Sequence, residues 1–354
     1  MHDLPVRLAK LRHITSSVHD ADAAQAFLED AFGAVAVRGS APQDILDQAG
    51  KVRHVALSDV RLQFIEPRVG TALAAAHERV GPGIVSLAYG VADLHRAETA
   101  LAARGIGMAP PTSVDDGGRS VPTRRVLTAA DLGFDLELIQ EGGEYAGNAA
   151  ARLPAAAGCL SPLFQVELAV DDVRAPLDYL RTVFGAPQAE IEFAAFLGSL
   201  GVLEVLHADL GGVLLQYCRP LTARGSWAEL VKRQGRAVHN LTFLVDDMDN
   251  TVAALRRNGV SDLLAFNLDF GKLVGPQNVP AGLKPQRMVD LRALLGFHLE
   301  LSEVFAANID DYVLNPVLPW AAARTRSDRA RMSAPTLVDE TACASLPLVP
   351  PDQS

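Results

Sequence analysis

A recurring pattern of apolar and polar positions divides most of the chain into four similar segments. Each segment begins with a short stretch in which apolar and polar side chains alternate, as they do in a half-buried strand. An acidic residue follows, and then apolar positions spaced three and four residues apart, which predict an amphipathic helix. The four segments are residues 11–33, 84–105, 163–185 and 239–259.

The same residue types mark both ends of each predicted helix. An aspartate precedes each helix and can accept hydrogen bonds from its first backbone N–H groups. A glycine follows each helix, where a left-handed backbone conformation would end it. The aspartates are Asp20, Asp93, Asp172 and Asp247, and the glycines are Gly33, Gly105, Gly185 and Gly259.

Each segment is completed by a strand, and these strands match in alternate units. The matching pairs are 62–67 (LQFIEP) with 215–220 (LQYCRP), and 132–138 (LGFDLEL) with 295–301 (LGFHLEL). The matching glutamines, Gln63 and Gln216, lie 153 positions apart. The matching glutamates, Glu137 and Glu300, lie 163 positions apart. The sequence therefore predicts that a block of two units has been duplicated.

Composition and repeat boundaries predict the domain organisation. The 354 residues are 49% hydrophobic and 21% charged, which excludes a mainly disordered chain. We predict an N-terminal pair of units over residues 1–145, a C-terminal pair over residues 160–305 and a tail over residues 306–354. A linker rich in Gly, Ala and Pro over residues 142–162 would join the two pairs.

Charge and cysteine content restrict the partners and the compartment. The chain has 32 Lys and Arg against 42 Asp and Glu, a net charge of −10, which argues against non-specific nucleic-acid binding. No apolar stretch is long enough to predict a membrane-spanning helix, and the first twenty residues lack the apolar segment of a secretory signal. Cys159, Cys218 and Cys343 lie too far apart for a disulfide framework or a metal knuckle. We therefore expect a cytoplasmic protein with no nucleic-acid or membrane partner.

The units resemble those of the vicinal oxygen chelate superfamily, which includes glyoxalase I, methylmalonyl-CoA epimerase, extradiol dioxygenases and 4-hydroxyphenylpyruvate dioxygenase. The resemblance covers about residues 9–305. It rests on the order of strands and helix, on GPGIVSLAYGVAD at residues 81–93 and on the two GFxLEL endings. It implies an α+β fold in which four tandem βαβββ units form two paired curved-sheet cups. The reaction is not implied, because this scaffold carries many chemistries.

The resemblance also implies a divalent metal ion held by the first and last strands of paired units. The matching positions are His13, Gln63, Ser86 and Glu137 in the first half, and Gln165, Gln216, Asn240 and Glu300 in the second half. A carboxylate on a buried strand, such as Glu137, needs a cation or another partner. One imidazole among oxygen donors suits Mn, Co, Zn, Fe or Mg.

The pairing of the units stays open at this point, and with it the composition of the metal site. Units could pair within each half, across the duplication or between the chains of a dimer. Pairing the first unit with the fourth would bring His13 to Asn240 and Glu300. His239 adjoins Asn240, so alternation points it to the opposite face unless a strand bulge turns it inward. The ligands that we predict are His13, Gln63, Glu137 and Glu300.

A metal that chelates two neighbouring substrate oxygens eases the removal of the adjacent proton. A carboxylate beside the metal would act as the base, and the candidates are Glu137, Glu300 and Glu167. We therefore expect a metal-dependent epimerase or isomerase that moves a proton α to a carbonyl of a small molecule. Four-unit enzymes similar to 2-epi-5-epi-valiolone epimerase, which act on a cyclitol ketone, suggest one substrate class, and an acyl-CoA thioester is another.

Two alternatives to the epimerase stay open. An extradiol-type ring-cleaving dioxygenase fits the four-unit length, but Gln165 and Asn240 occupy the two histidine positions of its Fe(II) site. A non-catalytic protein that binds a small molecule would account for Ser86 and for a second half without imidazole ligands. Apolar helix faces and the relatives lead us to expect a homodimer.

Overall fold

The structure of the chain is a computed structural model that describes most of both halves. The described residues are 4–39, 41–115, 119–141, 160, 163–189, 201–245, 247–260, 264–268 and 286–303. Apart from Leu160, the predicted linker lies outside them, and so do the predicted tail, Cys159 and Cys343.

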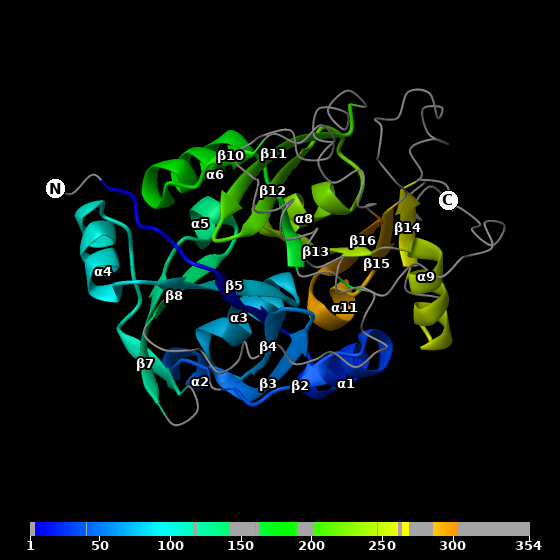
Figure 1. Cartoon of the computed structure of the whole chain (residues 1–354), viewed down its shortest axis with the longest axis horizontal. Helices are drawn as coiled ribbons and strands as arrows, with labels where there is room; N and C mark the ends of the chain where they lie inside the picture. The colour runs from blue at the N-terminus through cyan, green and yellow to red at the C-terminus, as the bar shows by residue number, and fades with distance from the viewer. Residues whose placement is uncertain are drawn as a thin grey trace.

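The first half contains two units, each with a strand, a helix and three further strands (Figure 1). The first unit comprises β1 (Leu11–Ser17), α1 (Ala21–Phe32), β2 (Val35–Ala36), α2 (Gln43–Leu46), β3 (Ala49–Leu57) and β4 (Val60–Pro67), followed by α3 (Ala72–Val80). The second unit comprises β5 (Gly83–Val91), α4 (Leu94–Ala103), β6 (Thr112–Asp115), β7 (Ser120–Val126), α5 (Ala129–Leu132) and β8 (Asp135–Gln140).

The second half repeats this order. The third unit comprises β9 (Leu163–Ala169), α6 (Arg174–Tyr179), the π-helical turn η3 (Leu180–Phe184), β10 (Gln188–Ala189), β11 (Leu203–Leu210) and β12 (Val213–Pro220), followed by α8 (Ser226–Gln234). The fourth unit comprises β13 (Ala237–Val245), α9 (Met248–Arg257), β14 (Leu264–Leu268), β15 (Gln286–Val289), α11 (Arg292–Leu295) and β16 (His298–Glu303). The expected α+β fold of four βαβββ units is confirmed.

Capping residues begin and end the helices largely as the sequence predicts. Asp20, Asp93 and Asp247 accept hydrogen bonds from the first N–H groups of α1, α4 and α9. Gly33 and Gly185 end α1 and η3 in the left-handed conformation. These local contacts explain why the same short pattern recurs at each helix.

In each half, the described strands form one eight-stranded sheet. The strand order is β2-β3-β4-β1-β5-β8-β7-β6 in the first sheet and β10-β11-β12-β9-β13-β16-β15-β14 in the second. The first and second units meet where β1 pairs antiparallel with β5, and the third and fourth units meet where β9 pairs with β13. Units therefore pair within each half, and no described strand of the first unit pairs with a strand of the fourth.

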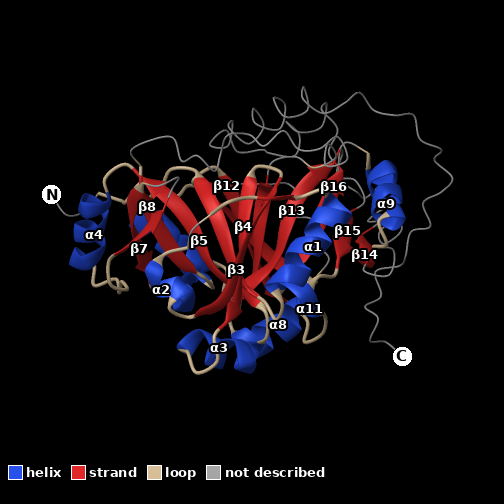
Figure 2. Cartoon of the chain, turned by 90° about the horizontal axis from the view of Figure 1, so that it is seen from below, coloured by secondary structure: helices blue, strands red, loops and turns tan. Residues whose placement is uncertain are grey.

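One face of each sheet packs against helices, which lie around the strands in Figure 2. In the first sheet this face carries Ile14, Leu62, Leu87 and Leu136, each at most 1% exposed, in a single apolar cluster with Leu28 of α1. Side chains alternate across a strand, so the polar residues between these positions line the opposite, inner face. The described part of the chain contains no helix with the length and apolar character needed to cross a membrane.

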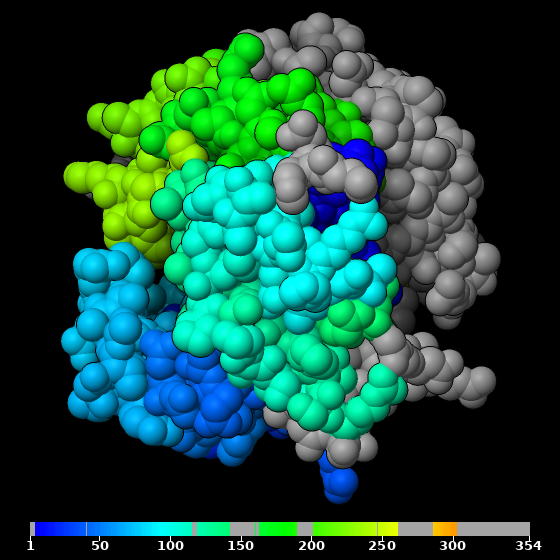
Figure 3. Space-filling model, turned by 90° about the vertical axis from the view of Figure 1, so that its left-hand side faces the viewer, coloured from blue at the N-terminus to red at the C-terminus, as the bar shows by residue number. Residues whose placement is uncertain are grey.

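The two halves interlock through reciprocal backbone contacts. A Cβ atom on Gly296, after α11, would lie 2.2 Å from the backbone nitrogen of Gly83 in the first half. A Cβ atom on Gly133, after α5, would lie 3.1 Å from the backbone nitrogen of Ala237 in the second half. The hydroxyl of Ser16 also lies 2.7 Å from a carbonyl oxygen of the second half. Figure 3 shows the blue and cyan surface of the first half directly against the green surface of the second.

Candidate functional site

A row of three residues crosses the inner face of the first sheet. His13 on β1 pairs in register with Ala88 on β5, and Ala88 pairs in register with Glu137 on β8. Because Ala88 carries only a methyl group, the longer side chains on either side can meet above it. His13 Nε2 lies 3.3 Å from Glu137 Oε2, and the two residues are 1% and 2% exposed. The fold thus joins two predicted ligands from strands that are not neighbours.

Polar atoms around this pair lack hydrogen-bond partners. Among the described residues, neither ring nitrogen of His13 has one, and neither does Glu137 Oε1 or Ser86 Oγ. The contact between His13 and Glu137 has the distance of an ion pair without the angles of a hydrogen bond. Leaving buried polar atoms unsatisfied costs about 1–3 kcal/mol each. A cation bound between the imidazole and the carboxylate would remove this cost.

Gln63 supplies a third candidate ligand on the same inner face of the first sheet, which is called the first cup below; the inner face of the second sheet is the second cup. Its register partner on β1 is Thr15, and its Nε2 donates a hydrogen bond of 3.2 Å to Thr15 Oγ1. The amide nitrogen is thereby engaged, and the carbonyl oxygen is the atom suited to a cation. Within the described chain no three His, Cys, Asp or Glu side chains form a group that could hold a metal. A divalent ion at His13 and Glu137 would therefore depend on this amide and on water or substrate, a donor set that fits an open catalytic site.

The short helix α2 covers the inner face of the first sheet. Its Ile45 packs against Ile65, which shares a strand face with Gln63. Asp44 Oδ2 lies 2.8 Å from Arg125 Nη2, and Arg125 is the register partner of Glu137 on β7. Burial raises the pKa of Asp44, the Arg125 charge opposes this rise, and the Glu137 charge adds to it. The helix thus keeps water away from the His13–Glu137 pair and places a charged pair beside it.

A second imidazole lies within electrostatic range of His13. His54 on β3 is the register partner of Gln63 and is 8% exposed. Burial, followed by the nearby charges of Arg61 and His13, lowers the pKa of His54 to about 3. His54 is therefore uncharged at neutral pH and adds a polar, neutral wall to this cup.

The polar side chains of the equivalent row in the second sheet form hydrogen bonds with their neighbours on the same face. Thr242 stands where the first sheet has Ala88, and it lies in register between Gln165 and Glu300. Glu300 Oε2 accepts hydrogen bonds from Asn240 Nδ2 at 2.5 Å and from Thr242 Oγ1 at 3.1 Å. Burial, with the charge of Glu167 nearby, raises the pKa of Glu300 to about 8. Glu300 is therefore already satisfied by its amide and hydroxyl neighbours, in contrast to the His13–Glu137 pair.

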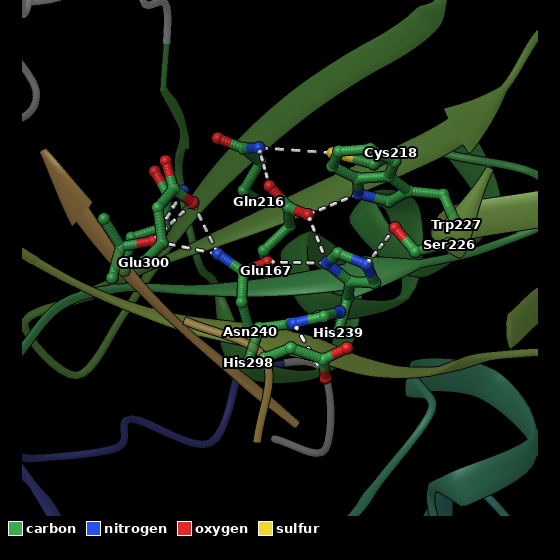
Figure 4. A network of polar contacts seen from close by, with 12 residues as sticks. Glu167, Gln216, Cys218, Ser226, Trp227, His239, Asn240, His298 and Glu300 are labelled. Carbon is green, nitrogen blue, oxygen red and sulfur yellow. Dashed lines mark hydrogen bonds and ion pairs between the residues drawn. The ribbon is translucent and has the colours of Figure 1, made fainter. Parts of the chain in front are cut away.

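Glu167 and His239 form the centre of a second polar network in this half (Figure 4). A register shift between Val238 and Asn240 places His239 in a bulge of β13, and this bulge turns its side chain into the network. His239 Nδ1 lies 3.1 Å from Glu167 Oε1, and its Nε2 lies 2.9 Å from Ser226 Oγ. The Trp227 indole N–H also donates to Glu167 Oε1.

The predicted site residues are divided between the two cups. His13, Gln63 and Glu137 share the first cup, whereas Glu300 lies in the second sheet, so the structure does not place it with His13. Glu167, a predicted base, is held by Trp227 and His239, and its Oε2 accepts a 2.5 Å hydrogen bond from Gln216 Nε2.

The sequence interpretation missed Ser226 and Trp227, which begin α8. The signal that could have found them is the amphipathic segment SWAELVKRQ directly after Gly225.

Comparison with known proteins defines the fold. No family model matches the chain, and no curated protein matches it in sequence. A mutant of 4-hydroxymandelate synthase from Streptomyces coelicolor is similar in structure, with a TM-score of 0.60 and 18% identity over 93% of this chain and 100% of that chain. A fusion of a xylose isomerase-like TIM barrel with 4-hydroxyphenylpyruvate dioxygenase is similar with a TM-score of 0.55 and 16% identity. That match covers 92% of this chain and 53% of the fusion, so this chain spans about half of its length.

These observations define the fold, which consists of four βαβββ units in two sheets. The fold that the sequence resemblance implied is therefore confirmed. Sequence identities of 18% and 16% establish a shared architecture and leave the reaction to the chemistry of this chain's own residues.

Proposed function

We propose that this chain is a metal-dependent enzyme that acts on a small molecule with two adjacent oxygens in the first cup. The observation that carries this proposal is the His13–Glu137 pair, which is buried and 3.3 Å apart, and whose ring nitrogens and Oε1 have no hydrogen-bond partner among the described residues. A divalent ion bound there would act as a Lewis acid toward both substrate oxygens.

The residues of the first cup would have distinct tasks. His13 and Glu137 would hold the ion, and the carbonyl oxygen of Gln63 would complete its protein ligands. Ser86, whose hydroxyl lacks a partner among the described residues, would bind a substrate oxygen. Helix α2, tied to β7 by Asp44 and Arg125, would exclude water from the bound substrate.

Two reactions fit this site, and a different observation favours each. A dioxygenase reaction is favoured by the two similar structures, which are named as a 4-hydroxymandelate synthase and a 4-hydroxyphenylpyruvate dioxygenase fusion. An epimerase or isomerase reaction is favoured by the ligand set, because one imidazole with oxygen donors departs from the two-histidine set usual for Fe(II) oxygenases. Of the two, the dioxygenase is our first candidate, because the likeness extends over 93% of the chain.

The decisive experiment measures metal content, oxygen uptake and proton exchange on one preparation. We expect about one divalent ion per chain after reconstitution and none in His13→Ala. Oxygen uptake with catechols or 2-oxo acids would identify the dioxygenase, whereas deuterium incorporation from D2O without oxygen uptake would identify the epimerase. Equal metal content in the parent and His13→Ala would overturn the site, and ligand binding without metal would support a binding protein.

The subunit composition is a separate proposal. We retain the homodimer as a prediction, and light scattering on the purified chain tests it: a mass near 37.6 kDa would show a monomer and overturn it.

A further inference from the structure

Ser226, His239 and Glu167 form a continuous series of polar contacts in the second half, separate from the His13–Glu137 pair (Figure 4). Ser226 Oγ lies 2.9 Å from His239 Nε2, and His239 Nδ1 lies 3.1 Å from Glu167 Oε1. A hydroxyl, an imidazole and a carboxylate in this order are the arrangement that activates a serine for attack on a carbonyl. We propose that Ser226 is the nucleophile of a second active site that hydrolyses small esters, with His239 as its base and Glu167 as the positioning residue.

The contacts at Nδ1 of His239 select the tautomer that this chemistry needs. Two oxygens that can accept a hydrogen bond face Nδ1: Glu167 Oε1 at 3.1 Å and Asn240 Oδ1 at 2.9 Å. The assignment of the Asn240 oxygen follows from its Nδ2, which donates to Glu300 and Thr242. The proton of the neutral ring therefore resides on Nδ1, and Nε2 presents a lone pair to the Ser226 hydroxyl.

Neighbouring side chains hold Glu167 and His239 in this geometry. The Trp227 indole N–H and the Gln216 amide each donate to one oxygen of Glu167, and the Trp227 ring stacks on the His239 ring at 4.6 Å and 19°. His239 and Glu167 are only 2% and 3% exposed. A base and a carboxylate fixed from several sides and screened from water are preorganised for proton transfer.

Ser226 lies where solvent and substrate can reach it. It is partly exposed and, together with His239, lines a small surface pocket. Ser226 is also the first residue of α8, whose N-terminus has no side-chain cap. The positive end of this helix would stabilise the negative oxygen that forms when the serine attacks a carbonyl.

The pocket wall indicates the class of ester. Arg233 and Arg292 line it beside the apolar Leu230, and Glu229 is the acidic residue among the lining side chains. Arg292 also pairs with Asp290 at 2.7 Å, so Arg233 is the cation best placed for a ligand. We assign the site to small acyl esters that carry a second, anionic group such as a carboxylate.

The reaction needs only the ester and water. Ser226 Oγ forms a bond to the carbonyl carbon while its proton passes to His239 Nε2. The bond from that carbon to the leaving oxygen then breaks, and the proton passes from Nε2 to the released alcohol. Water attacks the acyl-serine in the same way, and its proton returns to Ser226 through His239. One ester and one water thus give one acid and one alcohol, with no redox change.

Covalent labelling of the full chain tests this proposal directly. We expect a fluorophosphonate to add once per chain and peptide mapping to place the adduct on Ser226. Ser226→Ala should abolish the adduct, and His239→Gln and Glu167→Gln should slow labelling by about 100-fold or more. The matched control is Ser120→Ala, an exposed serine on β7, which should label at the parent rate.

Further measurements separate this site from the metal site and identify its substrate. His13→Ala and chelator-treated protein should label Ser226 at the parent rate, because the first cup takes no part. With p-nitrophenyl acetate and p-nitrophenyl hemisuccinate as substrates, Arg233→Ala should reduce the preference for the anionic ester about tenfold. Absence of the adduct from the folded parent, or equal labelling in a folded His239→Gln protein, would overturn the proposal. Loss of labelling on metal removal would also overturn it.

Discussion

His13 Nε2 and Glu137 Oε2 lie 3.3 Å apart although a strand separates β1 from β8. The residue between them is Ala88, and in the equivalent row of the second sheet Thr242 separates Gln165 from Glu300. The methyl group in the first cup leaves an imidazole and a carboxylate facing each other. The hydroxyl in the second cup instead bonds to the carboxyl group. The side chain in the middle of each row thus influences which chemistry the row can perform.

Removing either member of the first-cup pair should remove the metal. We expect His13→Ala and Glu137→Gln each to weaken divalent-ion binding by about 100-fold or more. This loss exceeds the one usual for a residue that only orients a metal ligand, because each change removes a ligand itself. Metal analysis after dialysis against a fixed ion concentration measures this. The control is His95→Ala, an exposed histidine on α4, which should keep the parent metal content.

Enlarging Ala88 should separate the pair without changing either ligand. In Ala88→Val the added methyl groups would occupy the space in which His13 and Glu137 meet, at a stability cost of about 1–3 kcal/mol. We expect metal affinity to fall at least tenfold in protein that remains folded by circular dichroism. Thr242→Val changes the equivalent position of the other cup and should leave metal binding intact. Parent-like metal affinity in Ala88→Val would show that the pair does not bind the ion together.

Glu300 should make the protein less stable as the pH rises. Burial raises its pKa from an ordinary value of 4.5 to about 8, so between these values the folded chain keeps a proton that the unfolded chain has released. Its contribution is therefore complete below about pH 4.5 and is lost as the pH rises through about 8, by at most about 1.4 kcal/mol per pH unit.

Glu300→Gln mimics the protonated carboxyl and should flatten this part of the stability profile, measured by urea unfolding from pH 5 to 9. Glu78→Gln, on the exposed side of α3, is the control and should follow the parent profile. If the free energy of unfolding of Glu300→Gln fell with pH as steeply as that of the parent, the raised pKa of Glu300 would be contradicted.

Gly296 should tolerate no side chain, because its left-handed backbone (φ +86°) lies against the backbone of the first half. A Cβ atom there would approach Gly83 N to 2.2 Å, so we expect Gly296→Ala to lower the free energy of unfolding by about 3 kcal/mol or more. Gly259 has a similar φ of +82°, and no described atom would lie within 4 Å of a methyl group added there, so Gly259→Ala should cost about 1–2 kcal/mol. Denaturant unfolding of both variants would show whether the difference arises from the contact between halves.

Much of the fold follows from local signals in the sequence. The caps at Asp20, Asp93 and Asp247 and the alternation within strands depend on residues close together in the chain, so they can be predicted from it. The matched endings placed Glu137 and Glu300 at equivalent positions, and the register of the two sheets agrees with this.

The candidate sites could be predicted only in part. Register between distant strands depends on the whole sheet, so the sequence could not decide whether His13 would meet Glu137 or Glu300. The bulge that turns His239 inward was open as an alternative, but its occurrence depends on the pairing of β13 with β9. Ser226 was missed because its contact with His239, 13 residues away in sequence, depends on the position of α8 against the sheet.

The reciprocal seating of Gly133 and Gly296 has an evolutionary consequence. Each half completes the packing of the other, so neither can be discarded even if the chemistry of its inner face becomes dispensable. A half of the chain that is retained because the fold needs its packing is free to change the residues that point into its cup. Such a chain can keep the ancestral function on one side while the other side acquires a different one.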